Sequence, residues 1–191
     1  MMTGVTAEIL IHACCGPCTL SSLKTIDPKN VVYYFFNPNI FPFEEYCKRL
    51  ETFEKACKIF NLNYITEIYS QQEYEKAHRD WLMEISKVDN YYALKENSKR
   101  CEKCIQYRLK KIASICKKNN IPKFSTTLTA SPQKDINLIK SVALVVSSTE
   151  KIDYLDYIFR KNNSFQFSLE ICKKYNLYRQ NYCGCEFSKS P

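Results

Sequence analysis

The sequence is poor in glycine, with three among its 191 residues: Gly4, Gly16 and Gly184. Phosphate-binding loops need several closely spaced glycines, because their backbone approaches the phosphate and adopts positive φ angles. Neither a Gly-x-Gly-x-x-Gly fingerprint nor a Walker loop is present, so nucleotide binding by these loops is excluded. Two of the three glycines instead lie inside cysteine clusters, where we expect the chain to turn sharply.

Long apolar runs are also lacking. The first fifteen residues, MMTGVTAEILIHACC, have neither the basic start nor the apolar stretch of a signal peptide. No run approaches the roughly 18 apolar residues that a membrane span needs. We therefore expect a cytoplasmic protein with no membrane partner, folded as a single domain over residues 1–191. Because cytoplasmic thiols stay reduced, eleven cysteines favour metal binding or catalysis over a disulfide framework.

Positive charge and aromatic residues are plentiful. The net charge is +8, and the chain has 14 tyrosines and 11 phenylalanines. Cations contact phosphates and aromatic rings stack on unpaired bases, so this combination fits an RNA partner. A lysine-rich composition without any RNA function gives the same balance, so composition alone leaves both interpretations open.

Short apolar runs alternate with helical patterns along the chain. Strands are expected at residues 8–13, 31–36, 61–69, 124–128 and 154–159. Helices are expected from about residues 19 and 135, and over 43–60, 72–85, 101–118 and 168–177. This alternation predicts an α/β fold with a mostly parallel sheet. Such sheets bind ligands beyond the carboxyl ends of their strands, and CCGPC directly follows the first predicted strand.

Seven of the eleven cysteines fall in three short clusters. The clusters are Cys14, Cys15 and Cys18; Cys101 and Cys104; and Cys183 and Cys185. Disulfides, zinc, a redox dithiol and an iron–sulfur cluster are all compatible with such pairs. One zinc ion or one [4Fe–4S] cluster uses four thiols, which leaves about three for a second metal or redox chemistry. The other four stand singly in predicted helices and are expected in the core or on the surface: Cys47, Cys57, Cys116 and Cys172.

Five motifs occur in a fixed order along the chain. They read HACCGPC, FFNPNIFPFEEYCKR, RCEKCIQYRL, FSTTLTASPQKDI and LYRQNYCGCEFS. Together they resemble the QueH type of epoxyqueuosine reductase over nearly the whole chain. The resemblance implies a Rossmann-like fold of the adenine-nucleotide α-hydrolase (HUP) type, with cysteines where relatives of that fold keep a phosphate loop. It also implies a [4Fe–4S] cluster with an additional adjacent iron.

The reaction that the resemblance implies takes place on RNA. The epoxide of epoxyqueuosine, at the wobble position of the tRNA anticodon loop, is reduced to the alkene of queuosine with loss of water and without cobalamin. This step needs two electrons and two protons, so an external electron donor must take part, and the sequence does not identify it. Iron can act as a Lewis acid at the epoxide oxygen.

Site residues follow from the motifs. Expected cluster ligands are Cys14, Cys15, Cys101, Cys104, Cys183 and Cys185, with Cys18 as a further metal ligand. Arg179, four residues before Cys183, is the first choice for a catalytic group, because its guanidinium fork binds anionic oxygen. Arg100 and Arg108 are weaker candidates, and a solvated, salt-bridged Arg108 is the favoured interpretation. His12 and Asp135 are expected proton donors, although a satisfied buried histidine fits His12 equally well.

Two other functions compete with this interpretation. A zinc-stabilised, non-catalytic RNA-binding protein is disfavoured by seven clustered thiols and by the absence of paired Cys/His finger spacing. An ATP-dependent tRNA sulfurtransferase needs a Ser-Gly-Gly-x-Asp-Ser type of loop, which the chain lacks. The chain also departs from the family pattern in two loops, ALKENSKRC and RKNNSFQFS, which contain none of the expected glycines.

Overall fold

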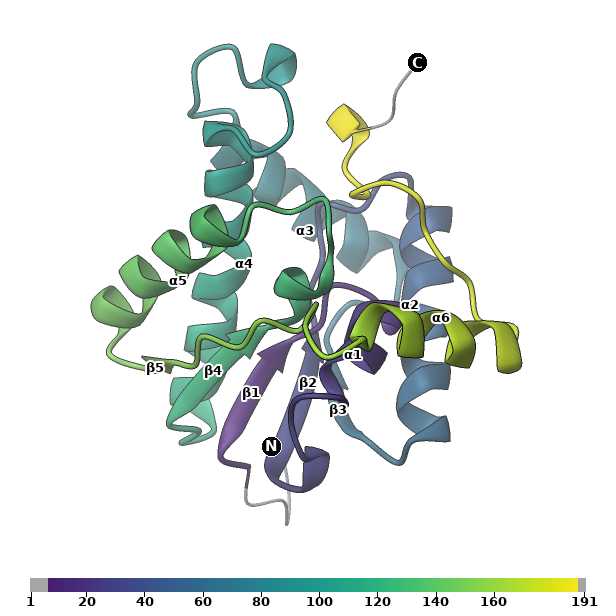
Figure 1. The fold of residues 1–191 in the computed structure, drawn as a ribbon. Helices are drawn as coiled ribbons and strands as arrows, with labels where there is room; N and C mark the ends of the chain where they lie inside the picture. Colours follow the sequence, from purple (N-terminus) through teal and green to yellow (C-terminus); the bar gives the residue numbers. More distant parts are fainter. Residues whose placement is uncertain (1–6, 189–191) are drawn as a thin grey trace.

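A central sheet of five parallel strands organises the protein in the computed structural model, which describes residues 7–188 (Figure 1). The strands are β1 (Ile9–His12), β2 (Val31–Phe35), β3 (Asn63–Thr66), β4 (Lys123–Thr126) and β5 (Asp153–Tyr154). Their order across the sheet is β3-β2-β1-β4-β5, and every pairing is parallel. The expected α/β, Rossmann-like fold is therefore confirmed.

Within the described part of the chain, six α-helices pack around the sheet. They are α1 (Gly16–Ser22), α2 (Phe43–Ile59), α3 (Gln71–Ile85), α4 (Lys99–Lys118), α5 (Ile136–Glu150) and α6 (Ser164–Lys174). Helix α1 packs against α2 and α6, whereas α4 packs against α3 and α5 and under β1 and β4. The chain moves outward from β1 to β3 and then returns to β4, so right-handed crossovers place these two groups on opposite faces. No helix in residues 7–188 has both the length and the apolar character that a membrane crossing requires.

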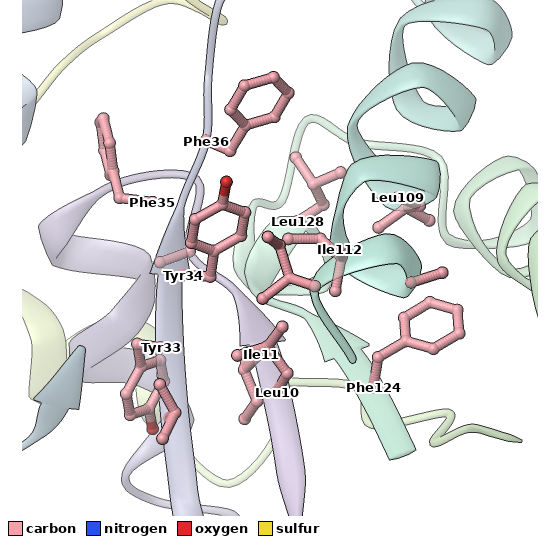
Figure 2. Packing of buried hydrophobic residues seen from close by; sticks show 14 of the residues in the cluster. Leu10, Ile11, Tyr33, Tyr34, Phe35, Phe36, Leu109, Ile112, Phe124 and Leu128 are labelled. Atoms are coloured by element: carbon pink, nitrogen blue, oxygen red, sulfur yellow. The ribbon is translucent and has the colours of Figure 1, made fainter. Parts of the chain in front are cut away.

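The core lies between the sheet and these helices (Figure 2). All five residues of β2 are buried, as expected for a parallel strand covered on both faces. The apolar stripe of α4, which includes Leu109 and Ile112, is fully buried as its spacing predicts. Two buried phenol groups in β2 have partners: Tyr33 Oη lies 2.8 Å from Ser22 Oγ, and Tyr34 Oη donates to a carboxylate oxygen of Glu67 at 2.7 Å.

Most elements lie where the sequence predicts them, but the strand expected over residues 154–159 is wrong. Pairing stops after β5, a strand of two residues. Beyond it, side chains of neighbouring segments bind the backbone carbonyls: Ser125 Oγ donates to Leu155 O, and Thr129 Oγ1 donates to Tyr157 O, both at 2.8 Å. These bonds replace the ladder that a longer strand would need. Helix α6 begins four residues earlier than the expected residue 168, at Ser164.

Asparagine occupies most of the left-handed turn positions, where glycine is the usual residue. Eight described non-glycine residues have positive φ, and seven of them are asparagines. They are Asn61, Asn90, Asn97, Asn120, Asn162, Asn163 and Asn176, with Lys151 as the eighth. Asparagine tolerates the left-handed region better than other residues with a Cβ atom. Three of these asparagines lie in the two glycine-free loops, so the left-handed turns there form without glycine.

Lys151 allows a test of how much a left-handed backbone conformation costs a residue other than asparagine or glycine. It ends α5 with φ 55° and ψ 46°, a conformation that costs a lysine about 1–2 kcal/mol. We expect Lys151→Gly to raise the free energy of unfolding by about 1 kcal/mol, after the entropy cost of glycine is included. Asn120→Gly, at the equivalent turn after α4 with φ 54°, is the control and should change little. Urea unfolding measures both, and equal gains would show that asparagine carries the same strain as lysine.

Candidate metal and substrate site

The site forms at the switch point of the sheet, between β1 and β4. The chain passes through β1 into the CCGPC segment, and β4 leads into a short 3-10 helix at Thr127–Ala130. The two segments are joined directly, because Cys14 N donates to Thr127 Oγ1 at 2.9 Å. Open α/β sheets bind ligands at such a crevice, beyond the carboxyl ends of the strands. Helix α4 begins and the C-terminal segment passes at this same edge (Figure 1).

Three thiols form a compact group there. The Sγ atoms of Cys14, Cys15 and Cys18 all lie within 4.8 Å of one another. Cys15 is the N-cap of α1, and its sulfur accepts the backbone N–H of Cys18 at 3.4 Å. Gly16 permits this close packing, because a Cβ atom there would lie 2.8–2.9 Å from Thr52 on α2. A group of three thiols this close can hold a metal ion.

The three thiols share negative charge unequally. Hydrogen bonds from Cys15 and Cys18 hold the pKa of Cys14 well below its usual value. Burial raises the pKa of Cys15, and the hydrogen bond to Cys14 raises that of Cys18. One thiolate is therefore stabilised by two neighbouring thiols. A bound cation would replace these thiol protons and favour the ionised form of all three.

The remaining four clustered cysteines surround a second hollow. Cys101 and Cys104 come from the first turns of α4, and Cys183 and Cys185 come from the YCGC turn about 80 residues later. A hydrogen bond from Cys185, assisted by the charge of Lys134, lowers the pKa of Cys183. Burial raises the pKa of Cys104. The structure thus divides the seven clustered thiols into a group of three and a group of four.

Arg49 on α2 holds the YCGC turn in place. Its Nη1 donates to Cys183 O at 3.0 Å and its Nη2 donates to Tyr182 O at 3.3 Å. Glu45, one helical turn earlier, binds Arg49 Nε at 2.7 Å. Gly184 has a φ of +111°, and a Cβ atom there would lie 2.7 Å from Arg49 Nη1. Sequence reasoning missed Arg49, although the motif FPFEEYCKR contains both members of this buried i,i+4 pair.

A cavity of about 220 Å³ lies between the two cysteine groups. Cys14 and Cys18 line it from the group of three, and Cys183 lines it from the group of four. Four basic residues also line it: Arg49, Arg108, Lys134 and Arg179. Among residues 7–188, its lining contains no aspartate or glutamate. The cavity therefore suits a substrate that is anionic or that develops negative charge.

Arg108 lies between the group of three thiols and the group of four thiols. It lines both hollows, is 3% exposed, and donates to Cys104 O at 3.4 Å and to Asn37 Oδ1 at 3.3 Å. Within the described residues it forms no ion pair with a carboxylate, so the expected solvated, salt-bridged Arg108 is wrong. Burial acts to lower its pKa, but nearby cysteines, Cys104 first, raise it above the usual value. Its electrostatic partners are therefore sulfur atoms.

Lys134 is a second cation against sulfur, with a side chain that is 11% exposed, and sequence reasoning passed over it for its neighbour Asp135. Lys134 Nζ donates to Cys183 Sγ at 2.9 Å and to Glu96 Oε1 at 2.5 Å. Burial opposes its charge, but Cys183 and Glu96 together raise its pKa above the usual value. Lys134 lies within the motif FSTTLTASPQKDI, and this position was the one feature of the sequence that could have indicated a role for it.

The three residues expected to be catalytic lie in different surroundings. His12 is fully buried: Nδ1 lies 2.9 Å from Thr126 Oγ1, and Nε2 lies 3.2 Å from Asn37 Oδ1. Burial, more than any other cause, lowers the pKa of His12 to about 3, so the ring is neutral near pH 7. Asp135 is exposed and caps α5 by accepting the N–H of Asn137 at 2.8 Å. Of the three, only Arg179 lines the central cavity.

The side chain of Gln180 contacts the group of three thiols. Its Nε2 donates to Cys15 Sγ at 2.8 Å, whereas its buried Oε1 has no hydrogen-bond partner within residues 7–188. Arg100, the other arginine considered from sequence, lies apart from the central cavity. Its guanidinium donates to Tyr91 O at 2.6 Å and stacks 4.6 Å from the ring centre of Phe187.

The fold and site together define a Rossmann-like α/β protein in which a cysteine centre able to hold a metal occupies the switch point. The model of the family described as epoxyqueuosine reductase QueH matches residues 9–191, so the chain belongs to this family. The chain is 37% identical over 180 residues to the Thermotoga maritima epoxyqueuosine reductase QueH, covering 94% of this chain and 89% of the relative. It is 33% identical over 187 residues to the Staphylococcus epidermidis protein of the same name, covering 97% and 77%. These matches confirm the resemblance seen in the five motifs, and the relatives are by name oxidoreductases.

Gly184 is the position where the site is most sensitive to one added methyl group. Gly184→Ala places a Cβ atom against the Arg49 guanidinium at a strained φ, so we expect the free energy of unfolding to fall by about 1–3 kcal/mol. We also expect less metal to be retained after anaerobic reconstitution, because the flanking cysteines move. Asn181→Ala, at an exposed position of the same segment, is the control. Unchanged stability and metal content in Gly184→Ala would contradict the close packing described above.

Proposed function

We propose that this protein reduces the epoxide of epoxyqueuosine, at the wobble position of tRNA, to the alkene of queuosine with loss of water. One observation carries the proposal: a single cavity is lined by cysteines of both groups and by four cations, with no carboxylate among the described residues. Family membership supports the same reaction. An external donor supplies the two electrons, and the two protons leave in the water that forms from the epoxide oxygen.

The group of four thiols is the proposed site of a [4Fe–4S] cluster, and the group of three is the proposed site of an additional iron. Four cysteine thiols are the usual ligand set of such a cluster, and Cys101, Cys104, Cys183 and Cys185 line one hollow. The triad has a further feature that fits a cation, because the unpartnered Gln180 Oε1 belongs to the side chain that binds Cys15. When bound, the cluster would pass electrons one at a time and the iron would act as a Lewis acid at the epoxide oxygen.

Buried positive charge supports the same assignment. A buried cation without a charged partner costs several kcal/mol, and Arg108 faces sulfur rather than carboxylate. A centre held by ionised thiolates supplies the missing negative charge. Zinc held by the same thiolates would supply it as well, so a zinc-stabilised RNA-binding protein is the alternative that the experiments must separate.

The chain's own residues have separate roles in the proposed reaction. Arg108 and Lys134 reach the cavity with N–H donors, and both can bind the epoxide oxygen as it gains negative charge. We assign the hydrogen bond to the epoxide oxygen to Lys134 and Arg108 rather than to His12 or Asp135, because His12 is neutral with both ring nitrogens engaged and Asp135 lies outside the cavity. His12 instead orients Asn37, whose side chain also binds Arg108. A tRNA substrate and reduced thiols together favour a cytoplasmic location.

Single cysteine variants test the division of the thiols. We expect Cys101→Ser, Cys104→Ser, Cys183→Ser and Cys185→Ser to lose the cluster, measured as acid-labile sulfide and by EPR of the reduced protein. We expect Cys14→Ser, Cys15→Ser and Cys18→Ser to keep sulfide but to lose about one iron and all turnover. Cys47→Ser, at an exposed position, and Cys57→Ala, in the core, are the controls and should keep both.

The same reconstitution separates the proposed enzyme from its alternative. A colourless protein containing only stoichiometric zinc, and inactive on epoxyqueuosine-containing tRNA under reducing anaerobic conditions, would remove the proposed function. Loss of sulfide in Cys14→Ser together with its retention in Cys183→Ser would reverse the assignment of the two groups.

Binding of the anticodon stem-loop should depend strongly on salt. A chain with a net charge of +8 releases counterions from the phosphates, so log affinity should fall linearly with log salt concentration. Stem-loops with epoxyqueuosine or guanosine at the wobble position should give the same slope, because phosphate contacts carry no sequence information. The modified RNA should bind more tightly at every salt concentration. Affinity that does not change with salt would rule out this mode of binding.

A further inference from the structure

An exposed aromatic ring stands at the rim of the central cavity. Phe165, in the first turn of α6, lines the cavity and is 44% exposed. The guanidinium of Arg179 lies 5.4 Å from the centre of its ring, and Arg179 also lines the cavity. An apolar ring and a planar cation therefore lie together where a ligand would enter a mainly polar, cationic hollow.

The Phe165–Arg179 pair is held firmly relative to the group of three thiols. Arg179 Nη1 donates to Ser168 Oγ at 3.2 Å, and Ser168 Oγ donates to Pro17 O at 2.8 Å. Pro17 belongs to the CCGPC segment, and α6 packs along α1. Ser168 is 2% exposed, so this connection is buried. The packing of α6 on α1 and these two hydrogen bonds therefore set the position of the rim relative to the cysteines.

We propose that Phe165 and Arg179 form a stacking platform for the base of the wobble nucleotide, an inference that rests on the proposed function. Unpaired RNA bases stack on aromatic rings and on arginine planes. A base stacked at the rim covers the exposed ring and leaves its cyclopentane substituent pointing toward the thiols inside. On this assignment Arg179 positions the substrate, and Arg108 and Lys134 contact the reacting oxygen.

The chain offers a matched control on the same helix. Tyr175, which ends α6, is 40% exposed, and Lys174 Nζ lies 5.1 Å from the centre of its ring. This pair has the same chemistry as the Phe165–Arg179 pair, an exposed ring beside a cation. Neither Tyr175 nor Lys174 lines the central cavity, so general RNA attraction affects both pairs whereas stacking of the wobble base affects only one.

The test uses the reconstituted protein and an anticodon stem-loop with 2-aminopurine at the wobble position. Stacking quenches the fluorescence of this base, and the same titration gives Kd. We expect Phe165→Ala to lose most of the quenching and to raise Kd about tenfold, the usual size of one base–aromatic contact. Phe165→Trp should keep both. Tyr175→Ala should match the wild type, and a stem-loop with an abasic wobble position should bind wild type and Phe165→Ala equally.

Other outcomes would overturn the platform. Equal effects of Phe165→Ala and Tyr175→Ala, or unchanged quenching in Phe165→Ala with normal metal content, would show that no base stacks there. Arg179→Ala with unchanged Kd and quenching but a lower single-turnover rate at saturating RNA would make Arg179 a catalytic group instead. Turnover by the wild-type protein tests the proposed function separately, because a platform that fails in an active enzyme leaves the reaction intact.

Discussion

Buried positive charge against sulfur is the interaction on which the rest of the site depends. Arg108 and Lys134 lie inside the protein, and each is held in the charged form largely by nearby cysteines. Removing a cation from water costs more than a few neutral hydrogen bonds return, so Arg108 depends on negative charge at sulfur, whereas Lys134 also has an ion pair with Glu96. In turn, beside the hydrogen bond from Cys185, the charges of Lys134 and Arg108 help to lower the pKa of Cys183.

Three stretches that are remote in the chain must meet for this balance to exist, and the fold brings each to the same edge. CCGPC follows β1, the RCEKC residues begin α4, and YCGC is drawn in by Arg49 from α2. Parallel strands make such a meeting natural, because every strand delivers its next residue to one side of the sheet. Helix α6 extends the same arrangement outward, joining the rim of the cavity to the first cysteine segment through Ser168 and Pro17.

The sequence was informative where local patterns decide the outcome. The apolar stripe of α4 and the place of CCGPC after a buried strand follow from periodicity and strand order, and both are confirmed. The sequence was not informative where the role of a residue depends on partners that are distant in the chain. Arg49 acts on a carbonyl 134 residues away, and nothing near it in the chain signals that bond. Lys134 and Asp135 are adjacent, yet one faces sulfur and the other caps a helix. The two side chains point in different directions from the backbone, and the sequence does not show which of them faces the site.

The division of labour between asparagine and glycine shows two different reasons for keeping a glycine. A left-handed backbone conformation alone does not require glycine in this protein, because seven such positions hold asparagine. At Gly16 and Gly184 a Cβ atom would lie within 2.8 Å of a neighbouring side chain, and there no substitute fits. Glycine codons begin with two guanines, whereas asparagine codons begin with two adenines. A gene under pressure toward adenine and thymine can therefore encode asparagine at such turns, whereas Gly16 and Gly184 lie where the cysteine segments are packed too tightly for a side chain.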